Sequence, residues 1–548
     1  MRTTHADRTR MSTLGYLCMA LAVTLWALPA GAQQIVVFET HAPVGGQWEG
    51  DIDVSAQCVS PGGERVWNDG NLIDIMSGAY IEQAAAVVPD EAGGIIVFAE
   101  AVAREGQYVG DWEILAQRVD ARGRLMWNDG ESSVVVASST WSERHPVAVP
   151  DGRGGAFVFY EAYAPAGSEW AGDVDIRGQH VSGSGELLWD EGGVPVASSI
   201  VLEQQPCAIS DGAGGAIVAY QLVMREGEQA NVGHIAAQRV SADGQLLWNG
   251  GESSVVVAAS GWDQRRPVAV PDGMGGALIF CEAGAPAGGE WAGDIDVHGQ
   301  RVSADGQLMW EGGEASVGVH TSGYLEVSPV AVSDGNGGAV VVCSAAAAEG
   351  ELAGDWEVLA QRVSAAGQLL WNGGDRATIV SALKLYERGP CALADGVGGA
   401  FVAFEAYFPE GMEYAGDIDI YAQRVSADGQ VMWSDEGASL AVSTSTYLER
   451  WPCIVADGAG GVMVAFEAVA VTGEYAGDWE VLAQRVAPDG TLLWNDGDSS
   501  SLISFSRWGE RFVTMAEGGI GARDAQGDGG PAPGPGPGAA PRKNPLNP

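Results

Sequence analysis

The chain has 548 residues, of which 46% are hydrophobic and 80 are glycine, enough for one large repetitive domain or several ordinary ones. Acidic residues outnumber basic ones by 72 to 28, which gives a formal charge of −44. Nucleic acids are polyanions held by Lys and Arg, so this charge argues against them as partners and disfavours anionic membrane surfaces. Cations, cationic partners and neutral sugars are compatible with it.

Residues 1–32 have the order of a secretory signal peptide. Three arginines precede an apolar stretch over residues 14–28, and the small-residue sequence Ala30-Gly31-Ala32 follows. The apolar stretch is shorter than the ~20 residues that a membrane-spanning helix needs, although an uncleaved anchor is the alternative. We therefore expect a protein of bacterial type, secreted to the periplasm, the cell surface or the medium, with no transmembrane segment in its mature form.

Residues 33–521 consist of eight copies of a repeat of about 61 residues. One Trp marks each copy, and no window shows the 3.6-residue apolar period of a helix. The marker residues are Trp67, Trp127, Trp189, Trp248, Trp310, Trp371, Trp433 and Trp494.

Each copy reads as four short strands. In the seventh copy we expect strands over 390–394, 400–405, 417–425 and 430–433, because Asp-Gly and Gly-Gly turns separate β-rich runs. Many such copies without helices are typical of a propeller. The predicted fold is all-β: a single eight-bladed β-propeller with four antiparallel strands per blade.

The two ends of the repeat region predict a closed ring. Residues 35–39 begin in the register of a second strand, and residues 511–516 form an orphan first strand. One blade would then be shared between the N- and C-terminal segments, which removes exposed sheet edges. A solenoid would need distinct capping repeats, and the sequence has none. Residues 522–548 are dense in Pro and Gly and predict a disordered tail.

The repeat unit, which reads DGxGG…DIYAQRVxxxGxxLW over residues 34–521, resembles repeats of exported bacterial β-propeller proteins of mostly unknown function. The resemblance implies a propeller and no particular chemistry. The Asp-Gly-x-x-x-Trp hairpin is also similar to the tryptophan-docking motif of quinoprotein dehydrogenases, which are eight-bladed. The Thr-Gly pair of that motif is missing here, so the similarity implies shared blade geometry alone.

Residues that recur in every copy are expected to be structural. The marker Trp residues should pack between blades, and a Gln on each third strand should bond within the fold. The Arg that usually follows this Gln is expected to meet carboxylates such as Glu405 or Glu387. Six cysteines of the mature chain fit either buried thiols or bridges between neighbouring copies, such as Cys281 with Cys343.

Aromatic residues gather in two sets of loops that should share one face of the ring. The first set follows the second strands, and the second set connects successive blades. Aromatic plates beside polar groups suit sugar rings, whereas the alternative is that they seal the blade tops. The first set is Trp48, Tyr108, Trp170, Trp291, Tyr414 and Tyr475; the second is Tyr80, Trp141, Trp262, Tyr324, Tyr386, Tyr447 and Trp508.

Paired acids begin the third strands. Residues i and i+2 of a strand lie on one face, roughly 6.5–7 Å apart, so their oxygens could share a Ca²⁺ ion. The alternative is that these acids protect an outer edge. Odd copies carry the pairs Asp51/Asp53, Asp173/Asp175, Asp294/Asp296 and Asp417/Asp419; even copies carry Asp111/Glu113, Asp355/Glu357 and Asp478/Glu480, and the fourth copy departs from the pattern.

No catalytic motif stands out, because the seven histidines are scattered and the acids repeat around the ring. The leading hypothesis is a non-catalytic binding or scaffolding propeller with an acidic, aromatic-rich face for polysaccharide, with Ca²⁺ as candidate cofactor, or for another extracellular protein. A glycosidase or lyase with a central-channel site and a purely structural cell-surface protein are the alternatives. We expect a monomer.

Overall fold

Antiparallel sheets, with four strands in each of copies 2–8 and three in copy 1, provide almost all regular structure of the described residues in the computed structural model of the chain. The short turns of 3₁₀ helix are the only helical elements among the described residues. The all-β prediction is confirmed. The structure describes residues 17–18, 21–22, 33–42, 50–78, 80–103, 110–225, 231–286, 288, 291–347, 355–381, 383, 385–433, 439–445, 447–471, 477 and 479–506.

Copies are numbered by their marker Trp, so Trp67 belongs to copy 1. The first four copies contain β3 (Gln34–His41), β4 (Ile52–Val59) and β5 (Ile73–Met76); β6 (Tyr80–Pro89), β7 (Ile95–Ala103), β8 (Trp112–Val119) and β9 (Val134–Ala137); β10 (Ser142–Pro150), β11 (Ala156–Tyr163), β12 (Val174–Val181) and β13 (Val194–Ala197); and β14 (Leu202–Ser210), β15 (Ala216–Val223), β16 (Gly233–Val240) and β17 (Val255–Ala258).

The last four copies contain β18 (Asp263–Pro271), β19 (Ala277–Gly284), β20 (Ile295–Val302) and β21 (Val317–His320); β22 (Tyr324–Ser333), β23 (Ala339–Ala347), β24 (Trp356–Val363) and β25 (Thr378–Ile379); β26 (Tyr386–Ala394), β27 (Ala400–Tyr407), β28 (Ile418–Val425) and β29 (Leu440–Ser443); and β30 (Tyr447–Ala456), β31 (Val462–Ala470), β32 (Trp479–Val486) and β33 (Ser501–Ser506). The 3₁₀ turns are η1 (Trp67–Gly70), η2 (Asn128–Gly130), η3 (Trp248–Gly251), η4 (Trp310–Gly313), η5 (Trp371–Gly374) and η7 (Asn495–Gly497).

The predicted fourth strand is wrong in its position. Residues 430–433 contribute only one bridge, between Val425 and Val431, and the fourth strand of copy 7 is β29. The Gln423 side chain explains the difference, because its Oε1 accepts the backbone N–H of Trp433 at 2.8 Å. The chain therefore leaves the sheet at the Trp and returns to pair Leu440 with Ala422.

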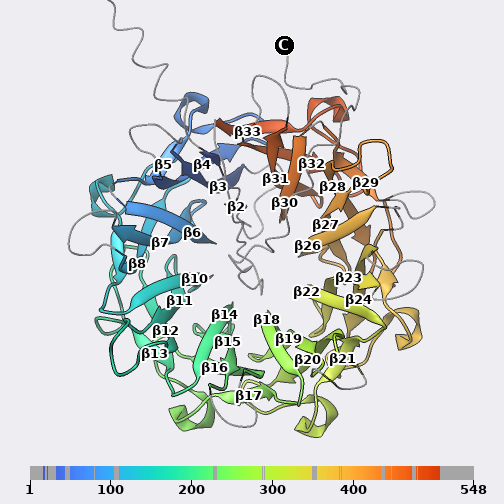
Figure 1. Ribbon diagram of the computed structural model, residues 1–548. Coiled ribbons are helices and arrows are strands. Elements are labelled where there is room, and N and C mark those ends of the chain that lie inside the picture. Colours follow the sequence, from blue (N-terminus) through green and yellow to red (C-terminus); the bar gives the residue numbers. More distant parts are fainter. Residues whose placement is uncertain are drawn as a thin grey trace, which may run out of the picture.

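Within each copy the strands pair in chain order, and the sheets lie radially about a common centre with the first strand innermost (Figure 1). Copies 5 and 6 form one eight-stranded sheet, joined by a single parallel bridge between Ile295 of β20 and Leu325 of β22. Every first strand from β6 to β30 carries a register shift near its start. The residue in this bulge is held by the preceding copy; for example, Glu282 Oε1 accepts the N–H of Ser328 at 2.7 Å.

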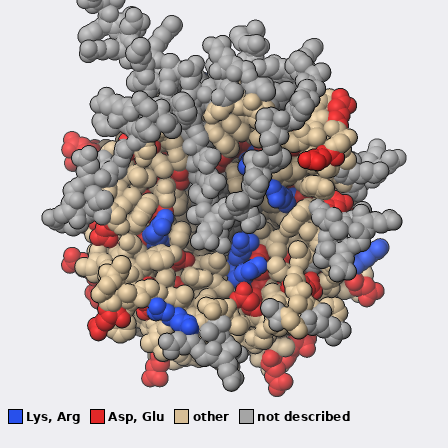
Figure 2. Space-filling model, in the orientation of Figure 1, with Lys and Arg blue, Asp and Glu red and all other residues tan. Residues whose placement is uncertain are grey.

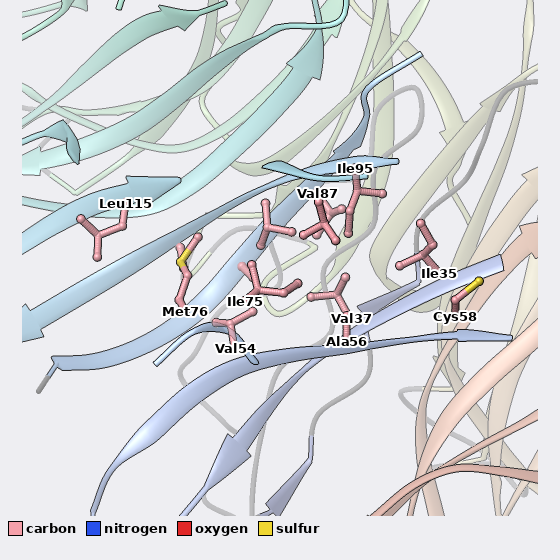
Figure 3. Packing of buried hydrophobic residues seen from close by; sticks show 14 of the residues in the cluster. Ile35, Val37, Val54, Ala56, Cys58, Ile75, Met76, Val87, Ile95 and Leu115 are labelled. Atoms are coloured by element: carbon pink, nitrogen blue, oxygen red, sulfur yellow. The ribbon is translucent and has the colours of Figure 1, made fainter. Parts of the chain in front are cut away.

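The marker Trp residues join neighbouring sheets, as predicted for a structural role. All eight are buried, and each donates its indole N–H to a turn carbonyl of the next copy. Trp494 of copy 8 donates to Pro61 of copy 1 at 2.8 Å. Between the sheets lie aliphatic clusters, and Figure 3 shows the one formed by Ile35 and Val54 of copy 1 with Val87 and Ile95 of copy 2.

The third-strand Gln and Arg residues also bond within the fold, although the predicted partner of the Arg is wrong. Arg301 forms an ion pair with Asp272 in the first turn of its own copy at 2.9 Å, and its Nη1 donates to Ala365 O of the next copy. The same ion pair recurs as Arg118–Asp90, Arg239–Asp211, Arg362–Asp334, Arg424–Asp395 and Arg485–Asp457. Turn aspartates thus take the place that we expected for Glu387 and Glu405.

The edge of β3 pairs with two short strands, β1 (Leu17–Cys18) and β2 (Leu21–Ala22), which lie within the predicted signal peptide. Residues 511–516, the predicted closing strand, lie outside the described residues. No helix in the described part of the chain has the length and apolar content to cross a bilayer. The six cysteines that follow residue 32 are buried free thiols, which leaves no bridge between Cys281 and Cys343.

Candidate binding face

Two kinds of loop meet at one end of the sheets. The first kind links the second and third strands of a copy, and the second links the fourth strand to the next copy. Their contact is direct: Ser138, in the connection after β9, donates to Glu113 Oε1 at the start of β8 with an Oγ–Oε1 distance of 2.7 Å. Side chains from both loops therefore share a face.

In three odd copies the loop before the third strand has the same turn. The backbone N–H of the first Asp bonds to the carbonyl of the aromatic residue three positions earlier, at 2.8 Å for Asp173 and Trp170. Copies 5 and 7 repeat the turn at 2.9 Å, with Trp291 and Tyr414 as the acceptors. The turn thus holds one aromatic residue directly beside one paired acid.

The predicted aromatic residues differ in exposure. Trp170 is 52% exposed, Trp291 61% and Tyr386 38%, whereas Trp141, Trp262 and Tyr414 are half-buried. Tyr447 differs from the exposed aromatic residues, because it is 6% exposed and packs within a hydrophobic cluster. Trp48, Tyr108, Tyr475 and Trp508 lie outside the described residues, as does the side chain of Tyr324, and Tyr80 packs partly buried against a cluster.

The paired acids are not solvated edge residues. Asp173, Asp175 and Asp296 are buried, as are Asp51 and Asp419; Asp53, Asp294 and Asp417 are half-buried. Asp294 and Asp296 meet a third carboxylate, Glu326, and one oxygen of each lies within 4.8 Å of the other two. Glu326 comes from β22, so the group spans copies 5 and 6.

Sequence reasoning missed this third acid, although a regular signal was present. A Glu occurs at the start of most first strands, about 30 residues after each acid pair: Glu82, Glu143, Glu203, Glu326, Glu387 and Glu449. All six are at most 3% exposed, and the Oε2 atom of each is buried without a hydrogen-bond partner. Such orphaned charged atoms are rare in folded proteins and require an explanation.

Burial governs the protonation of these groups. Burial raises the pKa of Glu326 to about 8, and the charges of Asp296 and Asp294 act in the same direction against a lowering hydrogen bond from Ser322. Burial likewise raises the pKa of Glu82 and Glu387 to about 9. The pKa of Asp53 rises to about 7 through burial and the neighbouring Asp51 charge. Three carboxylates this close repel one another unless a proton or a cation lies between them.

Copy 4 lacks the whole group. At the positions of Asp294, Asp296 and Glu326 the junction of copies 4 and 5 has Val232, His234 and Gln264. The side chains of His234 and Gln264 lie in contact there, and neither is a carboxylate. All three charges are absent together.

A second cluster, which sequence reasoning also missed, lies at the inner edge of copy 3. His145 Nδ1 is 3.0 Å from Glu161 Oε2, and the Tyr163 hydroxyl donates to the same oxygen. His145 lies in the bulge of β10, and Glu161 and Tyr163 lie at the end of β11, so the spacing of the three residues in sequence gives no motif. Burial lowers the pKa of His145, but its hydrogen bond with Glu161 and the charge of that residue outweigh burial and give a net raised value.

Comparison with known proteins gives distant likeness only. No family model and no curated protein matches the chain. Among solved structures, a puromycin-hydrolysing peptidase of Mycobacterium tuberculosis is 12% identical at a TM-score of 0.41, over 85% of this chain and 61% of the peptidase. An ulvan lyase of polysaccharide lyase family PL25 is 11% identical at a TM-score of 0.41, over 93% of this chain and 98% of the lyase. A GH43 endo-arabinanase of Bacillus licheniformis is 12% identical at a TM-score of 0.27, over 52% of this chain and 96% of the arabinanase.

The chain thus spans less than two thirds of the peptidase. Likeness at these TM-scores carries no argument about activity, and the resemblance of the repeat to exported bacterial propeller proteins stays a prediction.

Proposed function

We propose that the chain is a secreted, non-catalytic binding protein that holds polysaccharide on the face described above. The observation that carries this proposal is the exposure of Trp170 and Trp291 in matching turns of copies 3 and 5. An indole that a turn fixes in place, with more than half of its surface in water, offers a flat apolar plate at little entropic cost. Carboxylates and backbone groups beside such a plate suit sugar hydroxyls.

The face depends on a fold that we propose to be one closed, eight-bladed β-propeller. Two contacts between copies 8 and 1 support closure: Trp494 donates to Pro61 O, and Gln34 Nε2 donates to Ala456 O at 3.0 Å. A hydrophobic cluster that includes Val36, Phe38, Cys453 and Ala465 also spans the two copies. The indole bond of Trp494 and the cluster repeat the pattern seen at the other junctions.

The test is binding to a panel of immobilised neutral and acidic polysaccharides, with and without a chelator. A sugar ring that covers one indole face removes roughly 60–80 Å² of apolar surface, worth about 1.5–2 kcal/mol, so Trp170→Ala or Trp291→Ala should weaken binding roughly tenfold. Met274→Ala is the control, because Met274 is 72% exposed in a turn at the opposite end of the strands. Unchanged binding in the double Trp variant would refute the proposal.

The cluster of His145, Glu161 and Tyr163 favours a second candidate function, an extracellular carbohydrate-active enzyme with a central site. The Glu161 carboxylate argues against an enzyme, because it has a structural role that recurs in other copies. Its Oε1 accepts the Gln205 N–H in the bulge of the next copy, as Glu39 and Glu282 do at their own junctions. Tyr407 of copy 7 donates to Glu405 in the same way as Tyr163 donates to Glu161, so only His145 is particular to copy 3. Polysaccharide cleavage that the Tyr163→Phe variant abolishes would favour the enzyme over the binding protein.

A further inference from the structure

We propose that Asp294, Asp296 and Glu326 form a calcium site that ties copy 5 to copy 6. This inference goes beyond sugar binding and does not depend on it. The residues come from the start of β20 and the start of β22, the two strands joined by the parallel bridge between Ile295 and Leu325. An ion at this point would lie between two sheets that meet through few backbone bonds.

The geometry fits a shared ligand sphere. Carboxylate oxygens of the three residues lie within 4.8 Å of one another, and two oxygens on opposite sides of a Ca²⁺ ion are separated by about 4.8 Å at a bond length of about 2.4 Å. Asp294 is half-buried, which leaves a route from solvent, whereas Asp296 and Glu326 are buried. Water on the open side can complete the coordination.

Glu326 supplies an observation independent of the acidic cluster. Its side chain is fully buried, yet its Oε2 atom has no hydrogen-bond partner, and its carboxylate points toward the two aspartates. The other oxygen, Oε1, accepts a hydrogen bond from Ser322. A buried anionic oxygen without a donor is costly, and an ion among three carboxylates would remove that cost.

The donor set selects the kind of ion. Three carboxylate oxygen donors favour a hard cation. His298 Nε2 lies 3.6 Å from Asp296 Oδ2 but is not one of the three converging groups. Calcium accepts irregular oxygen cages, whereas Mg²⁺ demands near-ideal octahedral geometry and keeps more of its water. The ligand is therefore Ca²⁺ rather than Mg²⁺.

The junction of copies 4 and 5 lacks these three acids, and the carboxylate of Asp263 there accepts the Gly233 N–H at 2.7 Å. Val232, His234 and Gln264 occupy the three positions there, and strands β16 and β18 keep the same place in the fold. A surface role for the acids gives no reason for the buried Glu to change together with the aspartates. A shared ion gives one, because removal of the ion requires removal of all three charges.

The test uses the full chain stripped of metal, with Ca²⁺ and Mg²⁺ titrated by calorimetry at neutral pH. The variant Asp294→Val/Asp296→His/Glu326→Gln installs the residues of copy 4, which the fold already accepts. We expect it to bind one Ca²⁺ fewer than the parent and to gain less in Tm when Ca²⁺ is added. Glu311→Gln/Glu314→Gln is the control, because it removes two exposed acids of copy 5.

Glu326→Gln covers the case in which the triple variant does not fold, since it keeps the shape of the side chain and should weaken the site at least tenfold. Equal Ca²⁺ stoichiometry and affinity in the parent and in either folded variant would overturn the proposal. Absence of Ca²⁺ binding to the parent chain would also overturn the proposal, because protons alone would then offset the repulsion among the three carboxylates. Trp170 belongs to copy 3, whereas Trp291 O accepts the Asp294 N–H beside the proposed ion site. Trp170→Ala is therefore the variant that keeps failure of sugar binding and failure of calcium binding separate.

Discussion

The contact between the first and last copies can be tested by one pair of matched substitutions. Trp494 joins copy 8 to copy 1, and Trp371 joins copy 6 to copy 7. Both indoles donate to a turn carbonyl at 2.8 Å, and they are 3% and 2% exposed. Each also packs against a turn Gly of the next copy. The two junctions are therefore equivalent in every contact that Trp→Phe would remove.

The cost of each substitution follows from these contacts. The acceptor carbonyls stay bonded after the change, because Arg485 also donates to Pro61 O and Arg362 to Ala427 O. The loss is then one hydrogen bond, about 1 kcal/mol, plus the smaller ring, about 1 kcal/mol more. If the ring is closed, Trp494→Phe and Trp371→Phe should each destabilise the protein by about 2 kcal/mol and agree within about 0.5 kcal/mol.

Urea unfolding followed by circular dichroism gives the overall effect, and hydrogen exchange of the amides in β4 gives the local one. Exchange is needed because a chain of many copies need not unfold in one step. A closed ring predicts that Trp494→Phe speeds exchange in copy 1, although residue 494 is more than 430 positions away along the chain from Pro61. A lowered urea midpoint for Trp371→Phe with no change in midpoint or exchange for Trp494→Phe would refute closure.

Two further predictions concern charges in the fold. Arg301→Ala leaves the buried Asp272 carboxylate without its ion-pair partner and should lower the free energy of unfolding in urea by about 3–5 kcal/mol. The control Arg124→Ala breaks an exposed pair with Asp120 and should cost less than about 1 kcal/mol. Equal losses in the two variants would contradict a stabilising role for the buried pair. Burial lowers the pKa of His320 to about 4, so in acid the imidazole takes up its proton in the unfolded chain before it does so in the folded one. The free energy of unfolding should therefore fall by about 3 kcal/mol as the pH drops from about 6.5 to about 4. His320→Met, which copies Met76 at the matching position, should lack that part of the pH dependence, and identical stability profiles would disprove it.

Much of the strand pattern could be predicted because repetition makes it visible. In copy 7, where bounds were predicted, the first three strands agree with β26, β27 and β28 to within a few residues. The fourth strand could not be placed in this way. Its short apolar run, such as Leu440–Ser443, follows a turn whose path depends on a hydrogen bond between Gln423 and Trp433 that no local pattern reveals.

The candidate site shows the same limit. The pair Asp294/Asp296 is visible as a motif, but Glu326 belongs to the next copy, about 30 residues later, and meets the pair only because neighbouring sheets touch there. His145 and Tyr163 escaped notice for a related reason, since a bulge in β10 turns the His toward Glu161. Contacts between sheets depend on bulges and on sheet packing, and sequence spacing encodes neither.

The repeated acids also limit which functions the face can have. A catalytic centre needs one arrangement unlike the others, and the acid groups at the junctions are nearly alike. Acids recur at most junctions, and at one junction none of the three positions is acidic, which is typical of scaffold residues that share one chemical requirement. Recognition must then come from what differs among copies, and the described residues offer the exposed Trp170 and Trp291 of two odd copies. The proposed ion site and the proposed sugar site thus use different side chains: carboxylates that lie where the sheets meet, and exposed indoles on the loops.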